Sequence, residues 1–373
     1  MKLFATTRNS AQRSIVAIAA LITTSASGNV VATDNSVPAI MDQGGTSGNL
    51  AEYILGVVDD YEKDFGGDVF TGSLKIGDTQ DFNSLRIQNG ARIFGAFTSL
   101  GYQAGSDNNE FIITGSGTFL NGGNSFNVGT DGSNNSGRVS NGADLFAAGL
   151  HVGLGQSGQP TYGANNSMVV DGGSWRSASF MSVGEYGSGN SLVVQNGGTV
   201  DTIQADVGRQ AGSNNNSALV TGFGSRINVQ NNFYLSFNSG SQNFLTIADQ
   251  GLVKVGTGGY DTLLSFSNDS RVRLDGGFLA MVGDQTSQIN ALINVGQLEV
   301  WDAATDSWIQ ATPASVSFAY FTDGTAAEAF SGYADLANYT IVTTAAVPEP
   351  ALTALLIGAG ALLAIKRRKT KLA

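Results

Sequence analysis

Apolar and polar positions alternate in short blocks that recur through the middle of the chain. Each block opens with an asparagine and has apolar or small residues at the second and fourth positions after it; the starts are Asn83, Asn109, Asn135, Asn166, Asn190, Asn216 and Asn243. Successive starts lie 26, 26, 31, 24, 26 and 27 residues apart. Because side chains two apart in a β-strand share one face, each block predicts a short strand with one face buried.

The alternation also predicts which side chains point inward in each copy. The first strands contribute the pairs Leu85/Ile87, Phe111/Ile113, Gly137/Val139, Met168/Val170, Leu192/Val194, Ala218/Val220 and Leu245/Ile247. After a glycine-containing turn, a second strand is centred near Ile93, Phe119, Leu145, Trp175, Val200, Ile227 and Val253. A third apolar residue then precedes glycine, as in Ile76-Gly77, Leu100-Gly101, Val128-Gly129, Val152-Gly153, Val183-Gly184 and Val207-Gly208.

Three short strands and three turns per copy predict an all-β fold, a right-handed parallel β-helix over residues 70–280. One copy cannot bury its apolar face, whereas stacked copies pair each strand with its equivalent one coil away. A propeller blade needs about 40 residues and four strands, and helical repeats need amphipathic helices that this stretch lacks. The recurring asparagines predict either a hydrogen-bonded ladder or simple tolerance of the left-handed turn conformation.

The flanking segments have different patterns. Within the N-terminal cap segment, residues 29–69, apolar residues between Leu50 and Phe65 follow helix spacing and predict a capping helix, with a leading pair of strands as the alternative. Residues 281–346 are rich in aromatic side chains and predict a C-terminal cap or an aromatic β segment; these are Trp301, Trp308, Phe318, Tyr320, Phe321, Phe330, Tyr333 and Tyr339.

Both ends of the chain indicate export. Lys2, Arg8 and Arg13 precede a short apolar run that begins at Ile15, and small residues follow at 25–28. This order is that of a secretory signal peptide, which we place at residues 1–28.

The other end reads Val347-Pro348-Glu349-Pro350, then 15 uncharged residues, then Lys366-Arg367-Arg368-Lys369. As a transmembrane helix the apolar run is short of the ~20 residues that usually span a bilayer. The basic residues predict a cytoplasmic C-terminus. An ordinary tail anchor is the alternative reading.

Residues 347–373 closely resemble the PEP-CTERM sorting signal of Gram-negative bacteria, in which a Val-Pro-Glu-Pro motif, a transmembrane segment and a basic end follow in this order. The resemblance implies an exosortase, a membrane transpeptidase, as partner, and cleavage near Pro348–Pro350 after a transient inner-membrane stage. It further implies delivery to the cell surface, the outer membrane or the medium, and exopolysaccharide or biofilm matrix as surroundings. The repeats resemble the passenger-type β-helix repeats of autotransporter adhesins.

Composition narrows the partners. Without both ends, 11 basic and 29 acidic residues remain, a net charge of −18 that disfavours nucleic acid and anionic lipid. The chain has no cysteine, so no disulfide holds the exported body together.

The sequence offers few candidates for chemistry, and we predict no catalytic residue, metal ligand or cofactor. His151 is the only histidine and is interpreted as a surface strand residue. Asp201 with Asp206, and Asp59 with Asp60, are carboxylate pairs without a sign of convergence across a substrate. Residues 107–110 and 131–134 offer loop oxygens that suit calcium, but known calcium motifs are absent.

Two functions follow as expectations. The first is an exported, non-catalytic surface or matrix protein, associated with exopolysaccharide and sorted by an exosortase. The alternative is a carbohydrate-active β-helix enzyme, a polysaccharide lyase or hydrolase. An enzyme should bring several carboxylates together at one place, whereas a structural protein should spread them over the coils.

Overall fold

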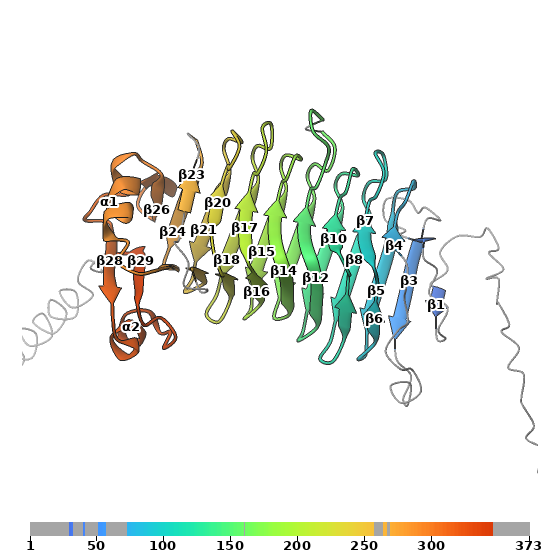
Figure 1. Ribbon diagram of the computed structural model, residues 1–373, viewed down its shortest axis with the longest axis horizontal. Coiled ribbons are helices and arrows are strands. Elements are labelled where there is room, and N and C mark those ends of the chain that lie inside the picture. The colour runs from blue at the N-terminus through green and yellow to red at the C-terminus, as the bar shows by residue number, and fades with distance from the viewer. Residues whose placement is uncertain are drawn as a thin grey trace, which may run out of the picture.

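The repeats form the coils of a parallel β-helix of about 8 turns, which confirms the predicted all-β solenoid (Figure 1). The computed structural model describes residues 30–32, 40–41, 51–56, 73–159, 161–256, 264–266 and 269–345. Successive coils lie side by side along the long axis of the molecule. The hand of the solenoid stays a prediction.

Each coil contributes one strand to a 12-stranded sheet and one or two strands to a 17-stranded sheet. The coil strands of the first sheet pair in parallel in the order β1 (Val30–Ala32), β3 (Ala51–Gly56), β5 (Asn83–Gln88), β8 (Glu110–Thr114), β11 (Ser136–Ser140), β13 (Ser167–Asp171), β15 (Ser191–Gln195), β18 (Ser217–Thr221), β21 (Phe244–Ala248), β24 (Arg271–Asp275) and β26 (Leu298–Asp302).

The second sheet consists of two parallel ladders that share two long strands. The first ladder runs through β6 (Arg92–Phe94), β9 (Phe119–Asn121), β12 (Asp144–Val152), β14 (Ser174–Val183), β16 (Thr199–Thr202), β19 (Arg226–Val229), β22 (Leu252–Val255) and β25 (Phe278–Val282). The second runs through β2 (Ile40–Met41), β4 (Ser73–Ile76), β7 (Phe97–Leu100) and β10 (Ser125–Val128), then β12 and β14, then β17 (Gln204–Val207), β20 (Phe233–Leu235) and β23 (Leu264–Phe266).

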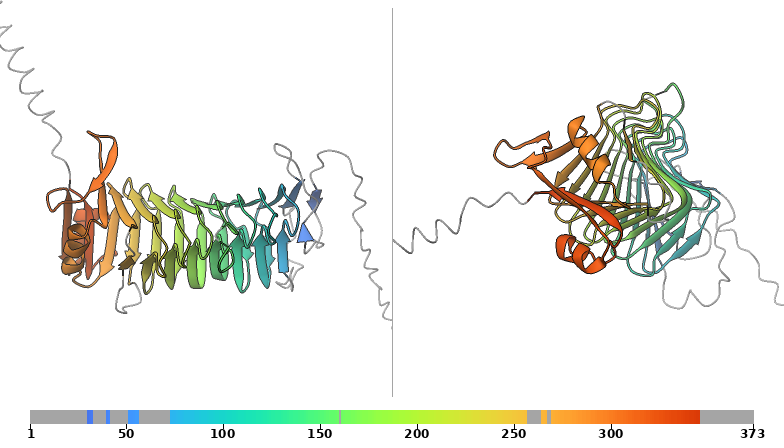
Figure 2. Two further views of the ribbon diagram at one scale, coloured as in Figure 1. Left: turned by 90° about the horizontal axis from the view of Figure 1, so that it is seen from above. Right: turned by 60° about the vertical axis from the view of Figure 1, so that its left-hand side comes forward.

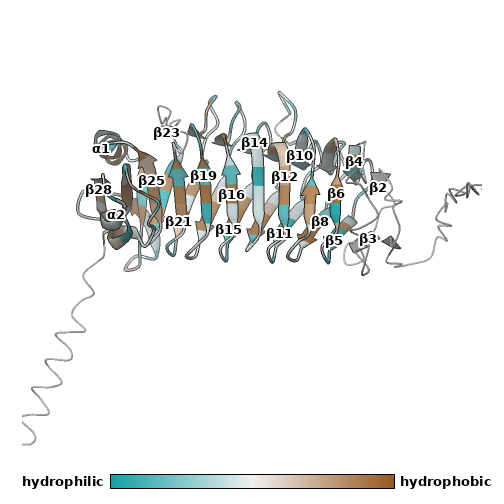
Figure 3. Cartoon of the chain, turned by 60° about the horizontal axis from the view of Figure 1, so that its bottom comes forward, coloured by the Kyte–Doolittle hydropathy of each residue, from teal (hydrophilic) through white to brown (hydrophobic). Residues whose placement is uncertain are grey.

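The predicted inward register is confirmed for the first and third strands. Leu192 and Val194 are fully buried, and their partners in the adjacent coils, such as Met168 and Val170, are buried as well. In the second strand one prediction is wrong: Leu120, not Phe119, stacks between Ile93 and Leu145 in the core. Hydrophobic and hydrophilic residues alternate along the strands accordingly (Figure 3).

The recurring asparagines form a ladder inside the stack, so the first of the two predicted roles is the one that the structure shows. The Oδ1 atom of Asn109 accepts hydrogen bonds from the backbone nitrogen and the Nδ2 atom of Asn83, at 2.8 and 3.0 Å. The same pattern joins Asn190 to Asn216, and Asn243 ends the ladder on Ser270. All seven asparagines are buried; they are Asn83, Asn109, Asn135, Asn166, Asn190, Asn216 and Asn243.

The left-handed conformation belongs to the residue before the ladder. Asn108, Asn134, Asn165 and Asn215 each have a φ between 56° and 58°. Asparagine tolerates this region because its short side chain can hydrogen-bond locally. One asparagine therefore makes the turn, and the next enters the ladder.

At the N-terminal end, a strand stands where helix spacing predicted a helix. Residues 51–56 form β3, which pairs in parallel with β5 from Ala51↔Asn83 to Gly56↔Gln88. The expected capping helix is therefore wrong over these residues, and the alternative of a leading strand holds there. Pairing with the exposed edge of β5 outweighs the local helical pattern.

The parallel stack ends at the C-terminal side in two helices and three antiparallel strands. These are α1 (Thr286–Asn294), β27 (Ser307–Gln310), β28 (Val316–Phe321), α2 (Gly324–Ser331) and β29 (Tyr339–Thr344). β29 lies antiparallel between β25 and β28, and β27 lies antiparallel to β26. Figure 2 shows this group covering one end of the solenoid.

The segment after α2 also folds back onto earlier coils. The Tyr333 hydroxyl accepts a hydrogen bond from the Gly224 backbone nitrogen at 3.2 Å and donates one to the Gln250 carbonyl oxygen at 2.7 Å. Asp335 pairs with Lys254 at 2.8 Å. These contacts attach the C-terminal group to the sides of the coils as well as to the last strand.

Candidate functional site

The residues that carry the predicted address lie outside the described part of the chain. This holds for Val347, Pro348, Glu349 and Pro350, for the basic residues Lys366, Arg367, Arg368 and Lys369, and for the signal peptide at 1–28. Their roles stay predictions. Across the residues that the structure does describe, no helix has the length and apolar character needed to cross a membrane.

The most distinctive polar feature of the described residues is a row that runs along the third strands. In each coil the member lies two residues before the turn glycine or its equivalent. The residue between them is the buried third-strand residue, so the member points to the opposite face, away from the core. Parallel pairing stacks these members from coil to coil: Lys75, Ser99, Asn127, His151, Ser182, Asp206 and Tyr234. We call this set the outer polar row.

Several members of the outer polar row are buried although they face outward. His151 is 6% exposed, and Ser182 and Asp206 are 0% exposed. Charged side chains three residues after Ser182 and Asp206 lie beside the row and help to cover it; these are Glu185 and Arg209. Buried ionisable groups are costly unless they are paired, so this part of the surface is unusual.

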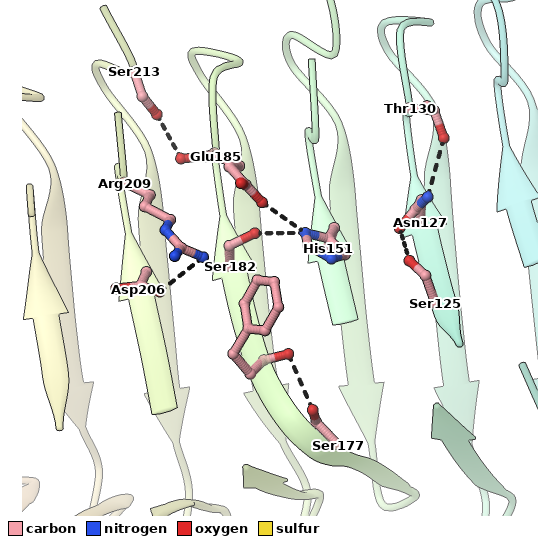
Figure 4. A network of polar contacts seen from close by, with 12 residues as sticks. Ser125, Asn127, Thr130, His151, Ser177, Ser182, Glu185, Asp206, Arg209 and Ser213 are labelled. Carbon is pink, nitrogen blue, oxygen red and sulfur yellow. Dashed lines mark hydrogen bonds and ion pairs between the residues drawn. The ribbon is translucent and has the colours of Figure 1, made fainter. Parts of the chain in front are cut away.

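His151, Ser182 and Glu185 meet at one ring nitrogen (Figure 4). The His151 Nδ1 atom lies 2.9 Å from Ser182 Oγ and 3.1 Å from Glu185 Oε2. The other ring nitrogen, Nε2, faces the backbone of Gly149, where an added Cβ would come within 3.1 Å of it. A serine nucleophile relay needs the serine and the carboxylate on opposite ring nitrogens, so these three residues do not form one.

Asp206 and Arg209 extend the group into the next coil (Figure 4). Arg209 Nη1 lies 3.8 Å from Asp206 Oδ2, and Gln204 Nε2 donates a hydrogen bond to the same oxygen at 3.0 Å. The Arg209 guanidinium also lies over the ring of Phe180, 4.9 Å from its centre, and that ring contacts His151 edge-on. We call His151, Glu185, Asp206 and Arg209 the charged cluster.

Burial raises the pKa of Asp206 from 3.8 to about 6. The hydrogen bond from Gln204 and the charges of Arg209 and His151 oppose this rise, whereas the neighbouring Glu185 carboxylate adds to it. The Asp206 Oδ1 atom is buried and has no hydrogen-bond partner among the described residues. A carboxyl with a strongly raised pKa beside other ionisable groups is a recognised sign of a functional site.

The structure corrects the interpretation of His151. The residue does lie on the outer face of a strand, but it is buried between Glu185, Ser182 and Phe180 and is not a free surface side chain. Sequence reasoning missed Glu185 and Arg209, which each follow a turn glycine directly. The signal in the sequence was a charged residue directly after Val-Gly. The backbone hydrogen bond from Arg209 to Gly184 continues the alignment of the strands, so these positions stack beside the outer polar row.

The other predicted carboxylates do not come together. Asp201 accepts a hydrogen bond from Asn228 Nδ2 at 2.7 Å, away from the partners of Asp206. Asp107 Oδ1 accepts from the Ser133 backbone nitrogen at 2.7 Å and so ties one loop to the next. Asp59 and Asp60 lie outside the described residues. Within the described ranges, no group of three or more histidine and acidic residues is arranged to hold a metal ion.

No protein-family model matches the chain, and no curated protein or solved structure matches it.

Proposed function

We propose that the protein is an exported, non-catalytic cell-surface or extracellular matrix protein associated with exopolysaccharide. Its address is the C-terminal signal at residues 347–373, which resembles an exosortase substrate and passes through a transient inner-membrane stage. The solenoid is the part that remains outside the cell.

The observation that supports a structural role is that charged side chains form ion pairs between consecutive coils. Ion pairs join consecutive coils: Arg176 with Asp144, Arg138 with Asp171, and Arg273 with Glu299. The register places these partners on neighbouring strands, so they brace the stack in the way the asparagine ladder does. Carboxylates spread over the coils in this way support a scaffold better than an active site.

The charged cluster is the one observation that favours an enzyme. Asp206 has the raised pKa of a general acid, and Glu185 is a second carboxylate beside it. The burial of Asp206 argues against an enzyme. A general acid must touch its substrate, and the Asp206 side chain is 0% exposed. A polysaccharide lyase or hydrolase is therefore the second candidate.

The test follows a tagged chain in its host, with the tag placed between the signal peptide and the repeats. The full chain is expected at the cell surface or in the medium. The variant that lacks residues 347–373 is expected to lose surface retention and to be released or held in the periplasm. Identical distribution of the two forms would contradict sorting by the C-terminal signal.

The second arm separates the two candidate functions. The purified chain is incubated with the exopolysaccharide of the host, and new reducing or unsaturated ends are measured. The scaffold function predicts no release, with or without Asp206→Asn. Release that Asp206→Asn abolishes would establish the enzyme instead.

A further inference from the structure

The charged cluster contains two carboxyls and one guanidinium, so its net charge depends on the protonation of His151. Glu185 and Asp206 are acidic, Arg209 is basic, and His151 is charged only when protonated. With His151 neutral and both carboxyls ionised, the cluster carries one excess negative charge in a largely buried setting. One additional proton makes the cluster neutral, and burial favours the neutral state.

The geometry identifies Asp206 as the group with the weakest compensation for a charge. Its nearest cation is Arg209, at 3.8 Å, which is beyond hydrogen-bond distance, and Gln204 Nε2 donates a hydrogen bond to its Oδ2 atom at 3.0 Å. The Oδ1 atom lacks a partner among the described residues. Glu185 Oε2 also lacks a hydrogen-bond partner among the described residues, but it lies 3.1 Å from His151 Nδ1, closer than Arg209 lies to Asp206.

The remaining groups around Asp206 do not supply a further charge. The strand on one side presents Ser182, whose hydroxyl is directed to His151. The strand on the other side presents Tyr234, whose hydroxyl accepts a hydrogen bond from Asn232 Nδ2 at 3.0 Å. The titratable and charged groups that face Asp206 are therefore His151, Glu185, Arg209 and Tyr234.

We propose that the charged cluster is a proton-binding site on the outer face of the solenoid, that Asp206 carries the proton, and that losing this proton loosens the coils of β14 and β17. A proton is the ligand that fits because the Asp206 side chain is fully covered. The scaffold role does not require this site. The site adds a response to the pH of the surrounding solution, and it is independent of how the chain is sorted.

The direction of the pH effect on stability follows from the difference in proton binding between the folded and unfolded states. The pKa of the aspartate is about 6 when folded and 3.8 when exposed, so the folded coil binds more protons between these values. The contribution of Asp206 to the free energy of unfolding is therefore fully present below pH 3.8. It declines as the pH rises through about 6 and is lost above that pH. Between pH 5 and 7.5 the opening equilibrium of these coils should rise about tenfold from this group alone.

Hydrogen exchange of the full chain tests the proposal. Protection factors, which remove the intrinsic pH dependence of exchange, are measured from pH 5 to 7.5 for residues 180–209 and for a reference coil at 110–128. In the wild type, protection of 180–209 is expected to fall about tenfold relative to the reference. Asp206→Asn, which keeps the shape and removes the charge, should make the ratio independent of pH.

Two further variants identify the carrier. Asp201→Asn makes the same change outside the cluster and should retain the wild-type response. His151→Gln should also retain it if Asp206 holds the proton. A response that survives in Asp206→Asn and disappears in His151→Gln would overturn the assignment to Asp206.

A direct titration keeps the proposal falsifiable even if a variant fails to fold. The carboxyl carbon of Asp206 in the wild-type chain is followed by nuclear magnetic resonance as the pH is changed. A midpoint near 6 is expected, and a midpoint near the ordinary aspartate value would refute the proposal, as would a flat protection ratio in the wild type.

Discussion

At the residue scale, the glycine that follows most of the third strands fits together with a ladder asparagine. Gly153 has a φ of 74°, and a Cβ added there would lie 2.1 Å from Asn190 Nδ2. The same relation holds between Gly184 and Asn216, where the added Cβ would come within 2.3 Å. Glycine is therefore required twice here, for its conformation and for the space that the amide occupies.

A pair of glycine variants separates these two requirements. Gly197 has a φ of 78°, and nothing lies within 4 Å of a Cβ placed there. Gly197→Ala should therefore show only the conformational cost of about 1 kcal/mol, whereas Gly153→Ala must also displace the ladder and should cost at least about 2 kcal/mol more. Thermal unfolding of both variants provides the measurement. Equal melting temperatures would mean that the ladder asparagine shifts to admit the Cβ atom at no cost.

At the element scale, each strand divides its side chains between the core and the outer face. Val194 is fully buried and stacks between Val170 and Val220, whereas its neighbour Val193 faces outward between Val169 and Leu219. The two positions carry the same residue type on the same strand. They differ only in the face of the sheet that they occupy.

Val194→Asp should destabilise the fold by several kcal/mol, because an unpaired carboxylate would enter the core. Val193→Asp should cost less than about 1 kcal/mol, since its carboxylate stays at the surface. The melting temperatures of the two variants provide the measurement. A larger loss for Val193→Asp would mean that the inward register is wrong.

At the scale of the whole molecule, the C-terminal group closes the described fold, and the proposed sorting signal follows it in the sequence. β29 ends at Thr344 between two antiparallel neighbours, only a few residues before Val347. Pro348 and Pro350 disfavour helix, so the sequence predicts that the motif stays outside any helix formed by the apolar segment after it. The sequence therefore predicts an extended segment, which is the form that a processing enzyme would bind.

We expect the tail to be removed from the mature protein. Mass spectrometry of the surface fraction should recover peptides that end before Pro350 and none from residues 351–365. The apolar segment is shorter than a usual membrane span, which suits an anchor that serves only for a time. Recovery of peptides from 351–365 in the extracellular protein would instead indicate a permanent anchor.

The sequence by itself determined the repeat, the inward register of most strands and the position of the turns. These features are local, because alternation fixes which side chains share a face and glycine or asparagine marks where the backbone must adopt a positive φ. Phe119 shows the limit: two adjacent apolar residues, Phe119 and Leu120, are both compatible with alternation. Only pairing with Ile93 and Leu145 selects Leu120 for the core.

Only the tertiary structure decided which polar residues meet. His151 and Ser182 are 31 residues apart, and the coil between them is longer than its neighbours, so the sequence spacing alone does not align them. The parallel register aligns them and places Asp206 one strand further along. The burial of this outward-facing cluster likewise depends on side chains from several coils, which is why the alternation predicted a surface residue at His151 and the stacked coils buried it.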